Sequence, residues 1–150
     1  MYNHILIPTD GSDVAQKGVD HGLSLAKCLG ARVTIIMVSE RFPVPVHAEI
    51  ASGWIPGSEE MARYAAMQQE IAQKVLAAVE AAAKELGVPA DTVHVPERYP
   101  AEAIIEVAKA QDGSLIVMAS HGRRGLRKLV LGSQTSEVLA RSPVPVLVVR

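Results

Sequence analysis

The strongest constraint on the fold is the regular alternation of short apolar runs with longer stretches of helical periodicity. The apolar runs are nearly continuous in Ile, Leu and Val, as expected for strands that are covered on both faces of a sheet. Strands alternating with helices are typical of βαβ units around a parallel sheet, so an α/β fold is predicted. The predicted strands span residues 4–9, 32–39, 92–95, 114–119 and 144–149.

Helices are predicted between these strands. The first begins after Ser12 as its N-cap, ends at Gly30 and buries a face formed by Ala15, Val19, Leu23 and Ala26. A long helix covers residues 58–86, and its predicted buried face comprises Ile71, Val75, Val79, Ala82 and Leu86. A third helix begins at Pro100 and ends near Gly113. The lone cysteine, Cys28, lies within the first helix and is predicted to be buried.

Length and composition favour one compact domain over residues 1–150, because 49% of the residues are hydrophobic and 21% are charged. The formal net charge of -1 provides no global basic field, which argues against nucleic-acid binding. No apolar run reaches the roughly 20 residues of a membrane span, and Met1 leads almost directly into a strand. We therefore expect a cytoplasmic protein without membrane insertion.

A glycine-punctuated basic segment is the main functional signal. It follows the apolar run that ends at Ala119, carries four basic residues, and closes on Gly132 and Ser133 before another helical stretch. Glycines let the backbone approach an anion closely, and the first amides of a helix have no intrahelical partner. This pattern indicates a phosphate site, although the same residues also fit an ordinary loop with a solvated basic surface, formed by Arg123, Arg124, Arg127 and Lys128.

Several common catalytic patterns are missing from the sequence. It contains neither the dinucleotide fingerprint G-x-G-x-x-G nor the Walker pattern, and it has no G-x-S-x-G nucleophile elbow. A hydrolase triad of Asp10, Ser120 and His121 is disfavoured, because adjacent residues seldom direct their side chains at each other. The remaining histidines are scattered without metal-ligand spacing. No catalytic residue and no metal-binding residue is predicted.

The spacing of the basic segment resembles that of the universal stress protein family. Gly122 is separated by nine residues from Gly132 and Ser133, and the first predicted strand leads into the turn at Asp10. In the nucleotide-binding branch of that family the loop reads G-x-x-G, nine residues, then G-[ST]. The first glycine of that pattern falls on Ala119 here, so one methyl group is added at this position.

The resemblance implies a doubly wound, five-stranded parallel sheet of order 3-2-1-4-5 with helices on both faces. It also implies that the chain binds ATP, ADP or AMP, with Mg²⁺ sharing the phosphate charge. Adenine would lie beside Pro8, Thr9, Asp10 and Val38, with backbone contacts from Met118 and Ala119. The phosphates would lie over Gly122, Gly132, Ser133, Gln134 and Thr135. The turn at Asp10 has a simpler interpretation as a helix cap.

The resemblance further implies a homodimer that pairs through the terminal strand, from Val144 to Val149. An apolar edge strand invites such pairing, unless a helix of the same chain covers it. The protein would sense and regulate a stress response through nucleotide occupancy, with a downstream protein partner that the sequence does not name. Two alternatives stay open: a slow ATP hydrolase or phosphotransferase, and a nucleotide-free adaptor that acts through the loop between Arg41 and Gly57.

Overall fold

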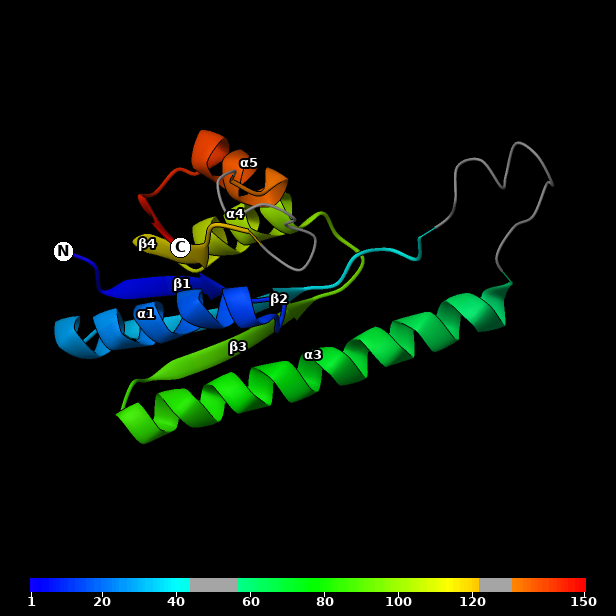
Figure 1. Ribbon diagram of the computed structural model, residues 1–150, viewed down its shortest axis with the longest axis horizontal. Coiled ribbons are helices and arrows are strands. Elements are labelled where there is room, and N and C mark those ends of the chain that lie inside the picture. Colours follow the sequence, from blue (N-terminus) through cyan, green and yellow to red (C-terminus); the bar gives the residue numbers. More distant parts are fainter. Residues whose placement is uncertain (44–56, 122–130) are drawn as a thin grey trace.

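The computed structural model describes residues 1–43, 57–121 and 131–150, which build a five-stranded sheet with helices on both faces (Figure 1). The strand order is β3-β2-β1-β4-β5, and every pair of neighbours is parallel. This confirms the predicted fold class and order. The strands are β1 (His4–Pro8), β2 (Arg32–Val38), β3 (Ala90–Val95), β4 (Leu115–Ala119) and β5 (Val146–Val149).

The helices lie in two layers that enclose separate apolar cores. Helices α1 (Asp13–Leu29) and α3 (Ser58–Leu86) cover one face of the sheet, and α4 (Pro100–Ala110) and α5 (Ser133–Arg141) cover the other (Figure 1). Successive side chains of a strand point to opposite faces. Ile5 and Ile7 of β1 therefore join the core beneath α1 and α3, whereas Leu6 joins the core beneath α4 and α5.

The helix boundaries follow the predicted capping signals. The Ser12 side chain accepts a hydrogen bond from the Ala15 amide at 3.2 Å and starts α1. Gly30 ends α1 in the left-handed conformation, with φ 64°, which a glycine adopts without a Cβ penalty. Pro100 occupies the first turn of α4. Among the helices assigned in the described ranges, each is too short or too polar to cross a membrane.

The prediction that Cys28 is buried is wrong, because this cysteine is exposed. The buried positions of α1 repeat with the helical period and end at Ala26. At about 100° per residue, Cys28 is turned by roughly 200° from Ala26 and faces away from the sheet.

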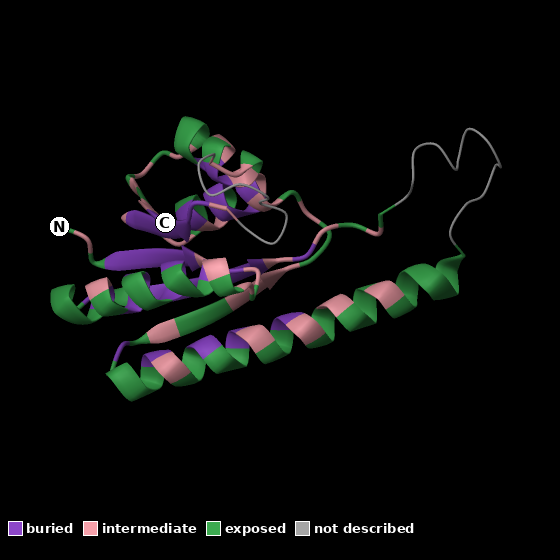
Figure 2. Cartoon of the chain, in the orientation of Figure 1, coloured by how far each residue is buried: buried purple, intermediate pink, exposed green. Residues whose placement is uncertain are grey.

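The buried face of α3 differs in part from its prediction. Val79 is buried as expected, but Ile71, Val75 and Ala82 are only half-buried and Leu86 is exposed. The fully covered stripe is instead formed by Ala72, Leu76, Val79 and Ala83, as Figure 2 shows along the helix. The alanines at both ends of this stripe let the helix lie close to the sheet, and Ile71 and Val75 flank the contact line.

The last strand begins later than predicted. It starts at Val146 rather than Val144, because Pro143 and Pro145 have no amide hydrogen for the ladder. Pro145 still takes part through its carbonyl, which accepts from the Ile116 amide at 3.0 Å. As a result β5 pairs with β4 over four residues and forms one edge of the sheet.

Candidate functional site

A cleft of about 340 Å³ opens at the carboxyl ends of β1, β2 and β4. This is where a doubly wound sheet binds ligands, since the connections after neighbouring strands diverge there. The cleft is lined by ten of the predicted site residues: Pro8, Thr9, Asp10, Val38, Met118, Ala119, Gly132, Ser133, Gln134 and Thr135. Gly122 lies outside the described residues, as do Arg123, Arg124, Arg127 and Lys128.

The turn after β1 holds Asp10 in the wall of the cleft. One carboxylate oxygen of Asp10 accepts from the Ser12 amide at 3.0 Å, and the Thr9 hydroxyl accepts from the Gly11 amide at 3.2 Å. Gly11 has a φ of 76°, a conformation that glycine adopts readily. The interpretation of this segment as a helix cap is therefore correct, and the same turn brings Asp10 to the cleft.

The main chain of Val38 forms the next part of the wall. Along β2 the main-chain groups point alternately to the two neighbouring strands. The Ile36 carbonyl accepts from the Thr9 amide on the β1 side, and the Ser39 amide donates to the Val95 carbonyl on the β3 side. The N–H and C=O of Val38 therefore point to the β1 side. Because β1 has already ended at Pro8, these two groups are directed into the cleft.

The first turn of α5 forms the opposite end of the cleft. Its N-cap is Gly132, which provides no side-chain cap, and the first turn carries no acidic residue. The amides of Ser133, Gln134 and Thr135 are early helix positions without intrahelical acceptors. Together with the helix dipole they favour an anion at this point.

The end of β4 fixes the position of this helix start. The Thr135 hydroxyl donates to the Ala119 carbonyl at 3.1 Å, and the Gly132 amide donates to the Ser120 carbonyl at 2.8 Å. A Cβ on Gly132 would lie 3.1 Å from the Cα of His121, tighter than an ordinary contact, so glycine favours this close approach. The sequence signal at Gly132 therefore has a specific steric cause.

The side chain of Gln134 has a structural role that the sequence did not indicate. Its amide oxygen accepts from the Ala101 main-chain amide at 2.9 Å and so caps the start of α4. Gln134 therefore ties the first turn of α4 to the first turn of α5. What remains for a ligand is its main-chain amide and its side-chain nitrogen.

The methyl group of Ala119 lies on the α1 face of the sheet. Val117 and Leu115, which lie two and four residues before Ala119 in the same strand, belong to the core beneath α1 and α3. Ala119 shares that face, because side chains alternate along a strand. A Cβ on Gly18 of α1 would lie 2.9 Å from the Ala119 amide, which shows how closely the helix packs there. The methyl group thus points away from α5, on the far face of the sheet.

Ser120 and His121 contact each other, contrary to the expectation for adjacent residues. The Ser120 hydroxyl and Nδ1 of His121 are 3.0 Å apart. His121 lines the cleft, whereas Ser120 is buried and does not belong to the lining. In this arrangement Ser120 orients the imidazole, and its hydroxyl is not placed as a nucleophile in the cleft.

The sequence analysis missed the wall that α3 contributes. Tyr64 and Gln68 line the cleft, and the Gln68 side-chain nitrogen donates to the Tyr64 hydroxyl at 2.7 Å. A signal was present, because Tyr64, Gln68, Ile71 and Val75 are spaced as neighbours on one helix face. The apolar stripe of α3 therefore continues as a polar stripe toward the cleft.

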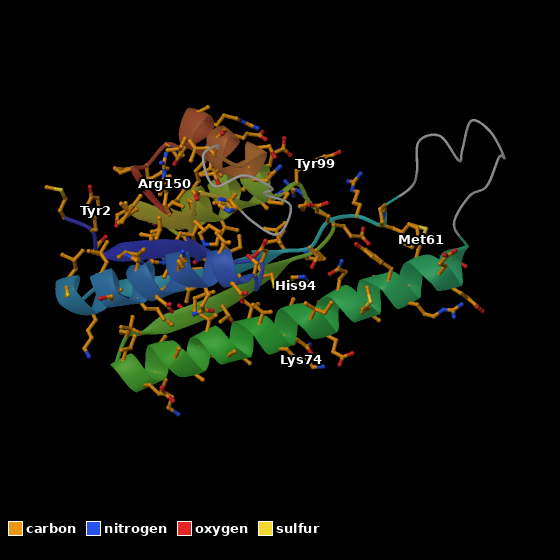
Figure 3. The ribbon with its side chains drawn as sticks, viewed as in Figure 1. Tyr2, Met61, Lys74, His94, Tyr99 and Arg150 are labelled. Atoms are coloured by element: carbon orange, nitrogen blue, oxygen red, sulfur yellow. The ribbon has the colours of Figure 1, made fainter. Side chains whose placement is uncertain are left out.

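A second polar group that was missed lies between the sheet and α3. His94 of β3 is placed there (Figure 3), with Nε2 2.6 Å from the Ser39 hydroxyl and Nδ1 2.7 Å from Oε1 of Gln69. Ser39 lines the cleft, directly after Val38. Burial lowers the pKa of His94, which favours the neutral imidazole.

Comparisons with known proteins agree with this architecture. Universal stress protein MJ0531 of Methanocaldococcus jannaschii is 36% identical over all of this chain and 83% of its own length. Universal stress protein YxiE of Bacillus subtilis is 33% identical over the full length of both. The solved structure of protein MJ0577 has a TM-score of 0.81 at 28% identity and covers 99% of this chain and 96% of its own.

Two further structures share the fold and carry adenine nucleotides of their own. A universal stress protein in complex with cAMP has a TM-score of 0.68 at 23% identity and covers 99% of this chain and 97% of its own. The universal stress protein of Archaeoglobus fulgidus in complex with dAMP has a TM-score of 0.70 at 16% identity, with 99% and 98% covered. The model of the universal stress protein family matches residues 1–150. This chain belongs to the universal stress protein family.

Proposed function

We propose that this protein binds ATP or a related adenine nucleotide in the cleft, and that occupancy of the cleft regulates a stress response. One observation supports this most strongly. A single cavity has an adjacent main-chain donor and acceptor at Val38 near one end and the uncapped start of α5 at the other. A nucleotide has the matching parts, a base with a polar edge and an anionic phosphate chain.

The base edge of adenine fits the main chain of Val38. Adenine carries an acceptor, N1, beside a donor, the N6 amino group. The N–H of Val38 would donate to N1 and its C=O would accept from N6, whereas guanine and hypoxanthine reverse this order. The apolar side chains of Val38, Ile104 and Met118 in the lining provide surfaces for the flat faces of the ring.

The phosphates would lie at the start of α5. The amides of Ser133, Gln134 and Thr135 and the Ser133 hydroxyl supply donors there, and Gly132 lets the backbone approach closely. Mg²⁺ would share the phosphate charge. Gly122 and the four basic residues that follow it in the sequence are proposed to complete this end of the site.

Family relatives support a nucleotide as the ligand, since a universal stress protein holds cAMP and that of Archaeoglobus fulgidus holds dAMP. We propose binding rather than fast turnover. The donors at α5 contact phosphate equally in the ground state and the transition state, and such uniform binding does not accelerate a reaction. Single-turnover product analysis with ATP tests the alternative of a slow hydrolase or phosphotransferase.

The thermal stability of nucleotide-stripped protein tests the proposed site. ATP with Mg²⁺ at 100 times its dissociation constant should stabilise the folded chain by about 2.7 kcal/mol. Gly132→Val should remove most of this ligand-dependent gain, because a side chain there would press on His121 and displace the start of α5.

Gly113→Val is the matched control for Gly132→Val. A Cβ on Gly113 would also meet main chain, the Ala108 carbonyl oxygen at 3.2 Å, but this position is not part of the cleft. The control should retain the full gain from ATP even if its own stability is lower. Absence of any gain in the parent protein would overturn the proposal and favour the nucleotide-free adaptor.

We also propose that two copies pair through β5, as the terminal strand from Val144 to Val149 led us to expect. β5 is an edge strand, and Leu147 on it is 42% exposed, so the helices of the same chain leave it partly uncovered. Leu147→Asp should convert a dimer to a monomer in sedimentation equilibrium. Leu29→Asp, at a leucine of α1 that is 48% exposed, should leave the mass unchanged. A monomeric parent would contradict the pairing.

A further inference from the structure

The hydrogen bonds around His94 fix the direction in which the Ser39 hydroxyl donates. Oε1 of Gln69 has lone pairs and no hydrogen, so Nδ1 of His94 carries the proton that this 2.7 Å contact requires. In a neutral imidazole the other nitrogen, Nε2, is then an acceptor. The Ser39 hydroxyl, 2.6 Å away, therefore donates its only proton to Nε2 of His94.

The other polar groups of Ser39 are also engaged. Its main-chain amide donates to the Val95 carbonyl at 3.0 Å, and its main-chain carbonyl accepts from the Arg98 amide at 3.2 Å. Ser39 is 5% exposed and lines the cleft next to Val38. What it has left to offer a ligand is the lone-pair side of its hydroxyl oxygen, which is an acceptor and not a donor.

We propose that Ser39 is a specificity-determining residue that presents only a hydrogen-bond acceptor to the base, and so selects a base with an exocyclic amino group. The inference rests on the proposed binding of an adenine nucleotide. One N6 hydrogen would bond to the Val38 carbonyl and the other to the Ser39 hydroxyl oxygen. His94 and Gln69 act as positioning residues, because they hold the Ser39 proton away from the cleft.

The first test compares ATP with purine riboside triphosphate, which differs from ATP only by lacking the amino group. In calorimetric titrations Ser39→Ala should bind ATP about fivefold more weakly than the parent, the effect of one hydrogen bond. Its affinity for purine riboside triphosphate should not change. The preference for ATP therefore falls about fivefold in this variant, which a merely structural role of Ser39 would not produce.

The second test changes the direction of the hydroxyl without removing it. In His94→Leu the Ser39 proton loses its acceptor, so the hydroxyl is able to donate to a carbonyl on the base. The preference for ATP over inosine triphosphate, which has a carbonyl at this position, should fall several-fold. Ser114→Ala is the control, because Ser114 is bonded to Asn3 and His4 and is not part of the cleft. It should keep both preferences of the parent.

The two proposals fail in different ways. If the parent binds ATP but Ser39→Ala and His94→Leu keep its preferences, the role of Ser39 is overturned and nucleotide binding stands. If the parent binds no nucleotide, both proposals fall. Should Ser39→Ala not fold, the change of preference in His94→Leu decides the inference alone.

Discussion

At the residue scale, three side chains that line the cleft are held by contacts that no ligand has to supply. Thr135 is bonded to the end of β4, Gln134 to the start of α4, and Asp10 to its own turn. Such prior engagement reduces the ordering cost of binding. The methyl group of Ala119 lies on the α1 face of the sheet and not over the start of α5.

We therefore expect Ala119→Gly to change the affinity for ATP by less than about threefold, since the methyl group does not face the proposed phosphate position. The same change should destabilise the fold by about 1 kcal/mol, because glycine costs conformational entropy in a strand. Calorimetric titration and denaturant unfolding measure the two effects. A large gain in affinity would contradict the placement of this methyl group.

At the element scale, the close packing of α1 on the sheet depends on two glycines, Gly18 against β4 and Gly22 against β1. A Cβ on Gly18 would lie 2.9 Å from the Ala119 amide, whereas a Cβ on Gly22 would meet the end of the Ile7 side chain at 2.4 Å. A main-chain atom moves only with its strand, but the end of an isoleucine side chain can change rotamer. The two positions therefore differ in what has to move.

Gly18→Ala should consequently destabilise the protein by about 1–3 kcal/mol, although alanine is the better helix former. Gly22→Ala should also destabilise the protein, because the fully buried Ile7 side chain would have to change rotamer to admit the methyl group. Ser24→Ala on the exposed face of α1 isolates the helix-propensity gain. Urea unfolding measures the stability of the three variants. A Gly18→Ala protein more stable than the parent would contradict the close packing against β4.

The sequence was sufficient for most elements and for one half of the cleft. Continuous apolar strands, the Ser12 cap and the glycines that end helices are local signals, so α1 was predicted correctly from them. The strand order was also predicted correctly, but from the family resemblance and not from local signals. Positions that follow strand ends were also found, because parallel strands carry them to one edge. The α3 wall was missed, since Tyr64 and Gln68 reach the cleft only through the path of a 29-residue helix. The network of Ser39, His94 and Gln69 likewise joins three distant segments.

At the scale of the whole molecule, two histidines link folding to pH. His4 is 2% exposed, with Nδ1 2.8 Å from the Gln111 carbonyl oxygen and Nε2 2.8 Å from the Thr34 hydroxyl. Burial is the main cause that lowers the pKa of His4, and burial also lowers the pKa of His94. Both groups therefore take up protons less readily in the folded chain than in the unfolded chain.

The free energy of unfolding should fall as the pH drops below about 6.5, the ordinary histidine pKa, because the unfolded chain then binds more protons. Above that pH the two histidines make their full contribution to the free energy of unfolding. This contribution is lost as the pH falls from there through their lowered folded-state pKa values. His4→Gln should show a shallower decline between pH 7 and 5 in urea unfolding. A decline as steep as that of the parent would contradict this role of His4.

Cytoplasmic location and a single domain over residues 1–150 stay predictions from the sequence. The residues outside the described ranges carry Gly122, the four basic residues and most of the loop between Arg41 and Gly57. Their contribution to binding is open to the same titrations as the rest of the cleft.

The most direct measurement is a calorimetric titration of the unmodified, nucleotide-stripped protein with ATP in the presence of Mg²⁺. Saturable heat with one ATP bound per chain is expected, since each chain has its own cleft between Val38 and the start of α5. Heat that does not saturate at millimolar ATP, in protein shown to be folded, would contradict nucleotide binding as the function of this cleft.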